Sequence, residues 1–310
     1  VAMGWRIGDR IMVAPTTRAS SGTAEAFTIG AFSIGNVVEL ASADGQFGGA
    51  TGQTFAAEAR ASGSGGGVAL LSAEVINLRR SVVITGDDFS QVPCSSFSTT
   101  ATTCTMGLHT AMMARGGLLR MQHARVERCG QRGVLGKYCI HLHLIASCPA
   151  CVVRGNAVER SMQRGLIIHG THQSLVEANV FADVRGANLY IEDGNEMYNR
   201  VLHNVAICPW AREGAKRGCT VPGTDNGEAD TALNQAGLWS LPSINHVVGN
   251  RFANHFNGMF FMANFAGGAG RGAAQGLLCT EAQLLGRIQG NTMHGHGRFG
   301  TYLLGPNFPR

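Results

Sequence analysis

The sequence predicts an all-β protein that folds as a right-handed parallel β-helix, a solenoid with coils of about 23 residues. Two patterns support this prediction: an asparagine recurs after a short apolar stretch, and a second short apolar stretch follows nine to thirteen residues later. Helix signals, such as capping boxes and apolar residues spaced by three and four, are nearly absent. A repeat period of about 20 to 50 residues is typical of solenoids.

The repeat is written as Val or Ile, two further residues and Asn. It ends at five positions: Asn156, Asn179, Asn204, Asn250 and Asn291. The first two intervals are 23 and 25 residues, and the third, of 46 residues, is twice 23. We expect these asparagines to stack as a ladder of side-chain amides at one turn of every coil, where left-handed backbone is tolerated. They are therefore structural residues and not candidates for chemistry.

The composition describes a turn-rich protein with one large core. Among 310 residues there are 43 glycines, 45% are hydrophobic and 15% are charged, so enough apolar material is present to bury a continuous interior. A net charge of +5 is compatible with an acidic polysaccharide as a partner but does not require one. The basic residues are scattered, which argues against nucleic-acid binding.

Nine cysteines favour an oxidising, extracellular compartment. Cys94–Cys104 and Cys208–Cys219 would each close a short loop, and Cys148–Cys151 is interpreted as a loop disulfide or two free thiols. The odd number leaves at least one thiol without an intrachain partner. The chain contains no run of eighteen apolar residues and no signal-peptide core, so we expect any signal or anchor to lie outside it.

Three segments resemble a known family: "GQRGVLGKYCIHLHL", "RSMQRGLIIHGTHQSLVEANV" and "VRGANLYIEDGNEMYNRVLHNV". They are similar to the β-helix of the cell-migration-inducing hyaluronan-binding protein, the transmembrane cell-surface hyaluronidase and the fibrocystin-like proteins. The N-terminal "GWRIGDRIMVAPTT" resembles the eight-glycine domain that precedes this β-helix. The resemblance implies the C-terminal part of an eight-glycine-like β domain at 1–65 and the β-helix at 66–310. Interruptions of the repeat at about 208–235 and 266–285 are expected to be side loops.

The resemblance also implies a function at the cell surface or outside the cell. It makes a hyaluronan-like polysaccharide a plausible ligand, calcium a conceivable cofactor, and other extracellular chains or neighbouring domains of the same precursor plausible partners. Two residues depart from the family pattern. Cys139 replaces a proline before the paired histidines, and Ala187 follows Gly186 where the family often has histidine.

Register along the repeat predicts which side chains share a face. Ile140 and Leu142, Leu166 and Ile168, and Leu189 and Ile191 should point inward, because they lie at equivalent positions of successive coils. The alternate positions then point outward. The expected outer columns are His143, His169, Glu192 and Ala263, and beside them His141, Ile167, Tyr190 and Phe261.

The outer columns carry the candidate chemistry. His141, His143, His169, Glu192 and Asp193 are the candidate catalytic residues, because imidazoles beside carboxylates can transfer protons near neutral pH. A second set, which could bind uronate carboxylates or stack on sugar rings, comprises Lys137, Arg164, Arg185, Tyr190 and Phe261. The alternatives are solvated sheet residues or a zinc-like ligand set, and no metal site is assigned.

Two functions remain open at this point. The chain is either a surface module that binds polysaccharide or serves in assembly, which we favour slightly, or a polysaccharide-depolymerising enzyme. A hydrolase needs two carboxyl groups about 5 to 10 Å apart, and the second is not identified. A lyase would use a base and a cation that neutralises the uronate, which suits the column better.

Overall fold

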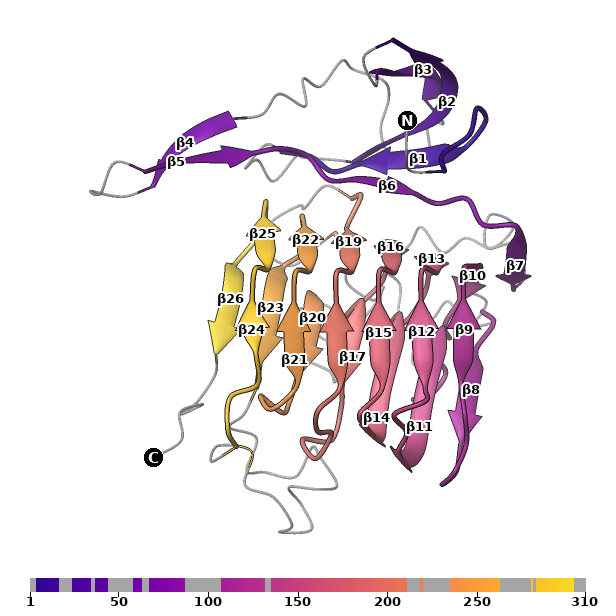
Figure 1. Cartoon of the computed structure of the whole chain (residues 1–310), viewed down its shortest axis with the longest axis vertical. Coiled ribbons are helices and arrows are strands. Elements are labelled where there is room, and N and C mark those ends of the chain that lie inside the picture. The colour runs from indigo at the N-terminus through magenta and orange to yellow at the C-terminus, as the bar shows by residue number, and fades with distance from the viewer. Residues whose placement is uncertain are drawn as a thin grey trace, which may run out of the picture.

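The structure is a computed structural model of the whole chain (Figure 1). Among the residues it describes there are 26 β-strands and no α-helix, and none of them forms an apolar helix long enough to cross a bilayer. The described residues are 4–16, 24–34, 37–43, 58–62, 67–86, 107–131, 135–210, 218–219, 235–262, 280 and 283–303.

Three stacks of parallel strands form the body of the molecule (Figure 1). Sheet 1 consists of β25 (Thr292–His294), β22 (Arg251–Ala253), β19 (Val205–Ile207), β16 (Val180–Val184), β13 (Ala157–Ser161), β10 (Ala124–Cys129) and β7 (Val82–Thr85). Sheet 2 consists of β26 (Phe299–Leu303), β23 (Asn257–Phe261), β20 (Ala236–Ser240), β17 (Leu189–Ile191), β14 (Leu166–His172), β11 (Ile140–Ser147) and β8 (Thr110–Met113). Sheet 3 consists of β24 (Ile288–Gln289), β21 (His246–Val248), β18 (Arg200–Leu202), β15 (Leu175–Glu177), β12 (Val152–Arg154) and β9 (Arg120–Gln122).

Strands that are neighbours in each sheet are three apart in the chain, so every coil adds one strand to each sheet. This arrangement is a parallel β-helix, which confirms the predicted fold class. Each coil pairs with the coil before and the coil after it, and stability depends on these neighbouring contacts.

The interior is filled by apolar side chains that stack in columns. On sheet 2 the inward columns contain the residue pairs expected from the repeat, namely Ile140 with Leu142, Leu166 with Ile168, and Leu189 with Ile191. A column on sheet 1 runs through Val126, Val158, Phe181, Ala206 and Phe252. Because each strand exposes alternate residues to the interior, these columns also fix which side chains face outward.

The asparagine ladder is present as predicted. Asn156 donates from Nδ2 to Oδ1 of Asn179 at 2.9 Å, and Asn179 donates in the same way to Asn204 at 3.0 Å. The ladder continues through Asn250 to Asn291 at 2.9 and 3.0 Å. Each buried amide also donates to a backbone carbonyl of a neighbouring coil, so the polar groups inside this corner are satisfied.

The 46-residue interval between Asn204 and Asn250 is one coil and not two, because these two side chains bond directly. The extra residues lie between β19 and β20, within the interruption at 208–235, and most of them fall outside the described residues. The interruption at 266–285 likewise lies mostly outside the described residues.

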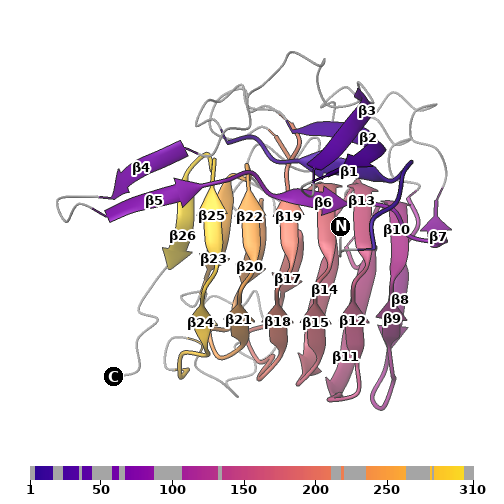
Figure 2. The ribbon, with the colours of Figure 1, turned by 45° about the horizontal axis from the view of Figure 1, so that its top comes forward.

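An N-terminal antiparallel sheet covers sheet 1 (Figure 2). Its strands are ordered β3 (Val37–Ala43), β2 (Glu25–Ser33), β1 (Arg10–Val13) and β6 (Val75–Asn77), and β4 (Glu58–Ser62) pairs separately with β5 (Gly67–Leu71). Met12 and Ile76 pack with Ile207 of β19, and Arg10 forms a 2.6 Å ion pair with Glu159 of β13. The sheet therefore extends to Asn77, past the border expected at residue 65, and β7 is the first strand of the β-helix stack.

Three disulfides close short loops in the described part of the chain. Cys208–Cys219 was expected, and Cys148–Cys151 is the loop disulfide of the two alternatives. Cys129–Cys139 was not expected; it joins the end of β10 to the residue before β11. The expected Cys94–Cys104 pair lies outside the described residues.

Candidate functional site

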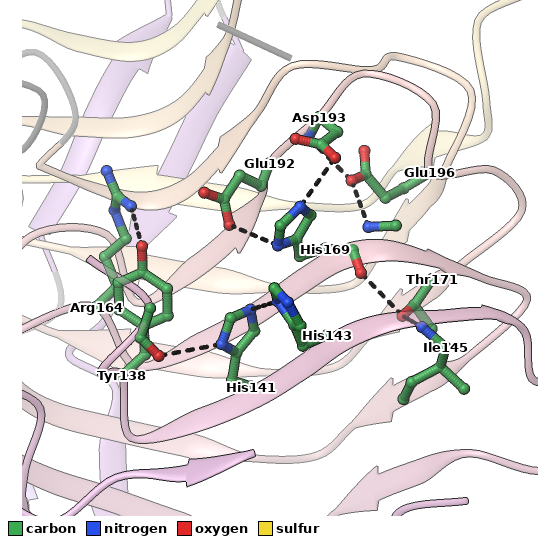
Figure 3. A network of polar contacts seen from close by, with 12 residues as sticks. Tyr138, His141, His143, Ile145, Arg164, His169, Thr171, Glu192, Asp193 and Glu196 are labelled. Carbon is green, nitrogen blue, oxygen red and sulfur yellow. Dashed lines mark hydrogen bonds and ion pairs between the residues drawn. The ribbon is translucent and has the colours of Figure 1, made fainter. Parts of the chain in front are cut away.

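The histidine cluster, which we define as His141, His143, His169, Glu192 and Asp193, lies on the outer side of sheet 2 (Figure 3). His143 is paired with His169 across β11 and β14, and Glu192 follows β17 in the next coil. The structure thus brings the five candidate catalytic residues together, in the register expected from the repeat.

The cluster lies where the regular pairing of β11 and β14 is interrupted. A β-bulge follows His143, and Leu144 has a φ of 54°. Gly170, directly after His169, has a φ of 52°, and a Cβ at this position would lie 2.7 Å from a methyl carbon of Leu144. The bulge and the glycine therefore fix His143 and His169 at the last paired position before the register shifts.

His141 and His143 are in direct contact. Nδ1 of His141 lies 3.2 Å from the carbonyl oxygen of Gly136, and because a carbonyl only accepts, Nδ1 carries the proton. Nε2 of His141 is then the acceptor that faces Nδ1 of His143 at 3.2 Å. Burial, with the neighbouring charge of His143, lowers the pKa of His141 to about 3, so this ring is neutral at physiological pH.

His169 is held between two carboxylates. Its Nε2 lies 2.9 Å from Oδ2 of Asp193, and its Nδ1 lies 3.6 Å from Oε2 of Glu192 (Figure 3). Burial lowers the pKa of His169, but the contact with Asp193 and the surrounding negative charge outweigh burial and raise the pKa above its ordinary value. The cluster therefore contains one histidine that stays neutral and one that protonates readily.

Glu196 positions Asp193, and the sequence analysis did not identify it. Its carboxylate is fully buried and accepts hydrogen bonds from the backbone N–H groups of Gly170, Asp193 and Gly194, each at 2.9 Å. Burial raises the pKa of Glu196 to about 7. Glu196 could have been identified from its spacing, because an acidic side chain three positions after Asp193 can accept hydrogen bonds from the backbone N–H groups of the preceding turn.

The cluster is more buried than an ordinary outer face. His141 is 3% exposed and His169 is 9% exposed, whereas His143 and Glu192 are half-buried. Access to the cluster therefore runs through His143 and Glu192.

Three of the five predicted binding residues lie near the cluster, but two of them do not face solvent. The Arg164 guanidinium donates to the Tyr138 hydroxyl at 3.0 Å and lies 3.8 Å from the centre of the Tyr190 ring. The other side of that ring stacks on Trp239 at 4.1 Å. Arg164 is therefore not the solvated charge of the alternative interpretation, and Tyr190 lies on the outer side of sheet 2 as expected but is covered by these contacts. Their role in binding stays a prediction. Lys137, one residue after Gly136, contacts Nε2 of His109 at 3.1 Å.

The remaining two binding candidates lie elsewhere. Arg185 contacts Asp183 at 3.2 Å and the carbonyl oxygen of Gly218 at 2.9 Å, at the turn between β16 and β17. Phe261 points into the interior, where it follows Ile191 and Ser240 in the inward column, so its expected outward position was wrong. The turn before β23 is one residue shorter than the equivalent turn before β17, which reverses the alternation. Ala263 lies outside the described residues.

An aromatic column that the sequence analysis missed runs along the outer side of sheet 2. It continues from Tyr190 through Trp239 and Phe260 to Tyr302. The first three are buried together with Tyr138, Ile167 and Leu241. Counting the shorter turn would have found position 260, whereas position 239 follows the interruption at 208–235, whose length the repeat spacing does not give.

A basic cleft, also missed, lies between the N-terminal sheet and the β-helix. Its volume is about 480 Å³, and its lining includes Trp5, Arg6, Arg79, Arg80 and His123. Arg79 pairs with Asp9 at 3.1 Å, and Arg80 donates to the carbonyl oxygen of Gly155 at 2.6 Å. Residues distant in sequence form this cleft, so no local pattern could have indicated it.

The donor atoms of the histidine cluster decide which metal it could hold. Calcium takes six to eight oxygen ligands, whereas this cluster offers three imidazole rings, so it does not fit calcium. Imidazole nitrogens with a carboxylate are typical ligands of zinc and related metals.

The fold and the site together define a class of protein: a parallel β-helix module with a histidine–carboxylate cluster on one lateral sheet and a β domain on another. Residues 105–301 match the CEMIP beta-helix family, and the chain belongs to this family.

Several relatives carry the same region within much longer chains. Human fibrocystin-L is 29% identical over 61% of this chain and 4% of its own length. Protein rliB of Dictyostelium discoideum is 30% identical over 61% of this chain and 16% of its own length, and human cell surface hyaluronidase CEMIP2 is 26% identical over 44% of this chain and 10% of its own length. No solved structure matches. The chain thus corresponds to a small part of each of these relatives.

Proposed function

We propose that this chain is an extracellular or cell-surface β-helix module that binds an acidic polysaccharide of the hyaluronan type. The three disulfides and the relatives named above support this location. The observation that carries the binding proposal is the basic cleft between the N-terminal sheet and the β-helix.

The cleft has the chemistry that a uronate-containing glycan requires. Guanidinium groups bind carboxylates through charge-assisted hydrogen bonds, and the cleft offers Arg6, Arg79 and Arg80 against one acidic residue, Asp9. Trp5 also lines the cleft and supplies an aromatic surface suited to packing against a sugar ring. A volume of about 480 Å³ lies within the usual range of about 300 to 1,000 Å³ for small-ligand sites.

The test is the affinity of the whole chain for a defined hyaluronan oligosaccharide, measured by calorimetry at low and physiological salt. Arg6→Ala and Arg79→Ala, tested separately, should each weaken binding by about 10- to 100-fold, because each removes a charged hydrogen-bond donor worth about 1.5 to 3 kcal/mol. Asp9 keeps Asn77 as a partner, so the fold should survive.

Arg200→Ala is the matched control, because Arg200 is an exposed arginine on β18 of sheet 3. It removes the same charge from a different face and should leave the affinity unchanged. Equal losses in the control and the cleft variants, or no binding by the unaltered chain, would refute the cleft as the site.

A second candidate function is depolymerisation of the same polymer, and the position of His169 between two carboxylates favours it. A histidine beside a carboxylate can transfer a proton, which is the task of the base in a lyase and of the acid in a hydrolase. Glu192 and Asp193 both face His169, an arrangement that favours the lyase role over a pair of carboxyl groups across a glycosidic bond.

The polymer length of hyaluronan during incubation, with and without calcium, tests this second function. A lyase would shorten the polymer and produce the ultraviolet absorbance of an unsaturated uronate, and His169→Gln and Glu192→Gln should abolish both. Unchanged polymer length would eliminate catalysis and leave the binding proposal intact, because the cleft is a separate site.

A further inference from the structure

We propose that His141, His143 and His169, with Glu192, form a binding site for a divalent transition-metal ion, with zinc as the best-suited ion. This inference does not depend on polysaccharide binding, and it rests on geometry in the described part of the chain. One ring nitrogen from each of the three histidines lies within 4.8 Å of the other two.

The separations are close to those of a tetrahedral zinc site. Zn–N bonds of about 2.0 to 2.1 Å place the ligand nitrogens about 3.3 Å apart. Nε2 of His141 and Nδ1 of His143 are already separated by 3.2 Å. Among the histidines His169 has to approach the other two, by up to about 1.5 Å, which a change in side-chain rotation can supply.

The strands hold these ligands on a rigid support. His141 and His143 occupy alternate positions of β11 and so project from the same side of the strand, and His169 is directly opposite His143 on β14. Ligand sites on paired strands are better defined than sites on loops.

The outer contacts orient the ring nitrogens as a metal site requires. The carbonyl oxygen of Gly136 binds Nδ1 of His141, which leaves Nε2 to face the centre of the cluster. The carboxylate of Asp193 lies 2.9 Å from Nε2 of His169, which leaves Nδ1, the nitrogen on the side of Glu192, as the metal ligand. Metal-bound histidines almost always have a carbonyl or carboxylate partner on their second nitrogen.

Glu192 completes the set. Its Oε2 lies 3.6 Å from Nδ1 of His169 (Figure 3), and a rotation of the side chain toward the three rings would bring it to a bound ion. Three imidazoles and one carboxylate make a four-coordinate ligand set suited to zinc, and copper or nickel would compete for it. The half-buried side chains of His143 and Glu192 give the ion a path from solvent.

The experiment uses the whole chain after removal of metals with a chelator. Zinc is titrated in competition with a chromophoric chelator, and cobalt is titrated as a spectroscopic probe of coordination. We expect one zinc ion per chain and the strong visible absorbance of tetrahedral cobalt. A chain that binds no zinc, or that gives only the weak absorbance of six-coordinate cobalt, would overturn the proposal.

Substitutions then assign the ligands. His143→Gln and His169→Gln preserve the size of the side chain and each remove a metal ligand. Loss of a partner on the second nitrogen of a ligand costs about 10- to 100-fold in affinity, and loss of the ligand itself should weaken zinc binding by more than this. His203→Ala is the matched control, because His203 is an exposed histidine in the turn after β18, and it should have no effect. Zinc affinity that is equal in the His143, His169 and control variants would refute the assignment.

Asp193→Asn tests the positioning role of the outer carboxylate. It should lower the zinc affinity by about 10- to 100-fold while the stoichiometry and the cobalt spectrum stay unchanged. His143→Cys, which restores a ligand, should recover zinc binding and add the charge-transfer absorbance of a cobalt–thiolate bond. Circular dichroism of every variant shows whether the β-helix is intact, so that loss of zinc is distinguished from unfolding.

Discussion

The asparagine ladder should contribute far more to stability in the middle of the stack than at its end. Asn179 is fully buried, and its side chain makes four hydrogen bonds: it accepts from the backbone N–H and Nδ2 of Asn156 and donates to Val153 and Asn204. Asn179→Ala removes all four and leaves the partner groups buried without replacement.

The magnitude follows from the value of each bond. At about 1 kcal/mol net per hydrogen bond, the four bonds amount to about 4 kcal/mol, and the unsatisfied buried partners add to this cost. Asn291 at the end of the ladder makes three side-chain bonds and is half-buried, so water can replace part of what is lost. We expect Asn291→Ala to cost about 1 to 2 kcal/mol.

The assay is equilibrium unfolding in urea, followed by circular dichroism, on chains with intact disulfides. The difference between the two variants is the diagnostic quantity, because both remove the same atoms. Losses of equal size at positions 179 and 291 would refute the reasoning, since burial within the ladder would then be irrelevant.

Three further predictions concern the site and the core. Burial raises the pKa of Glu196 from 4.5 to about 7, so between these pH values the folded chain holds a proton that the unfolded chain has released. The free energy of unfolding should therefore fall by about 3 kcal/mol as the pH rises from 4.5 to 7. Urea titrations at several pH values measure this slope, and Glu196→Gln should flatten it. Phe261→Ala should cost about 3 to 5 kcal/mol because the ring fills the interior, and a cost below about 1 kcal/mol in the same assay would contradict the inward register. Replacing Cys129 and Cys139 by serine should cost about 2 to 3 kcal/mol, as expected for a short closed loop, and a thermal midpoint unchanged from the parent would contradict this.

Much of the fold could be predicted from the repeat alone. The ladder asparagines define the corner of each coil, and alternation from that corner gave the inward pairs and the pairing of His143 with His169. These features were predictable because they depend on local spacing, which a solenoid converts directly into spatial neighbours.

The errors arose where spacing changed or where distant residues met. Phe261 was placed on the wrong face because one turn is shorter by a residue, and a single-residue shift reverses the direction of every following side chain. The burial of Arg164 between Tyr138 and Tyr190 could not be predicted, because it depends on packing across coils. The basic cleft depends on how the N-terminal sheet docks, which no repeat encodes.

The direct bond between Asn204 and Asn250 has a consequence for how such chains can diversify. A coil of twice the usual length closes with the same corner geometry as its neighbours, so added segments need not disturb the strands on either side. The connection between β19 and β20 can therefore carry additional residues while the strands of the β-helix keep their positions. This makes it a suitable position for engineering an inserted peptide into this protein.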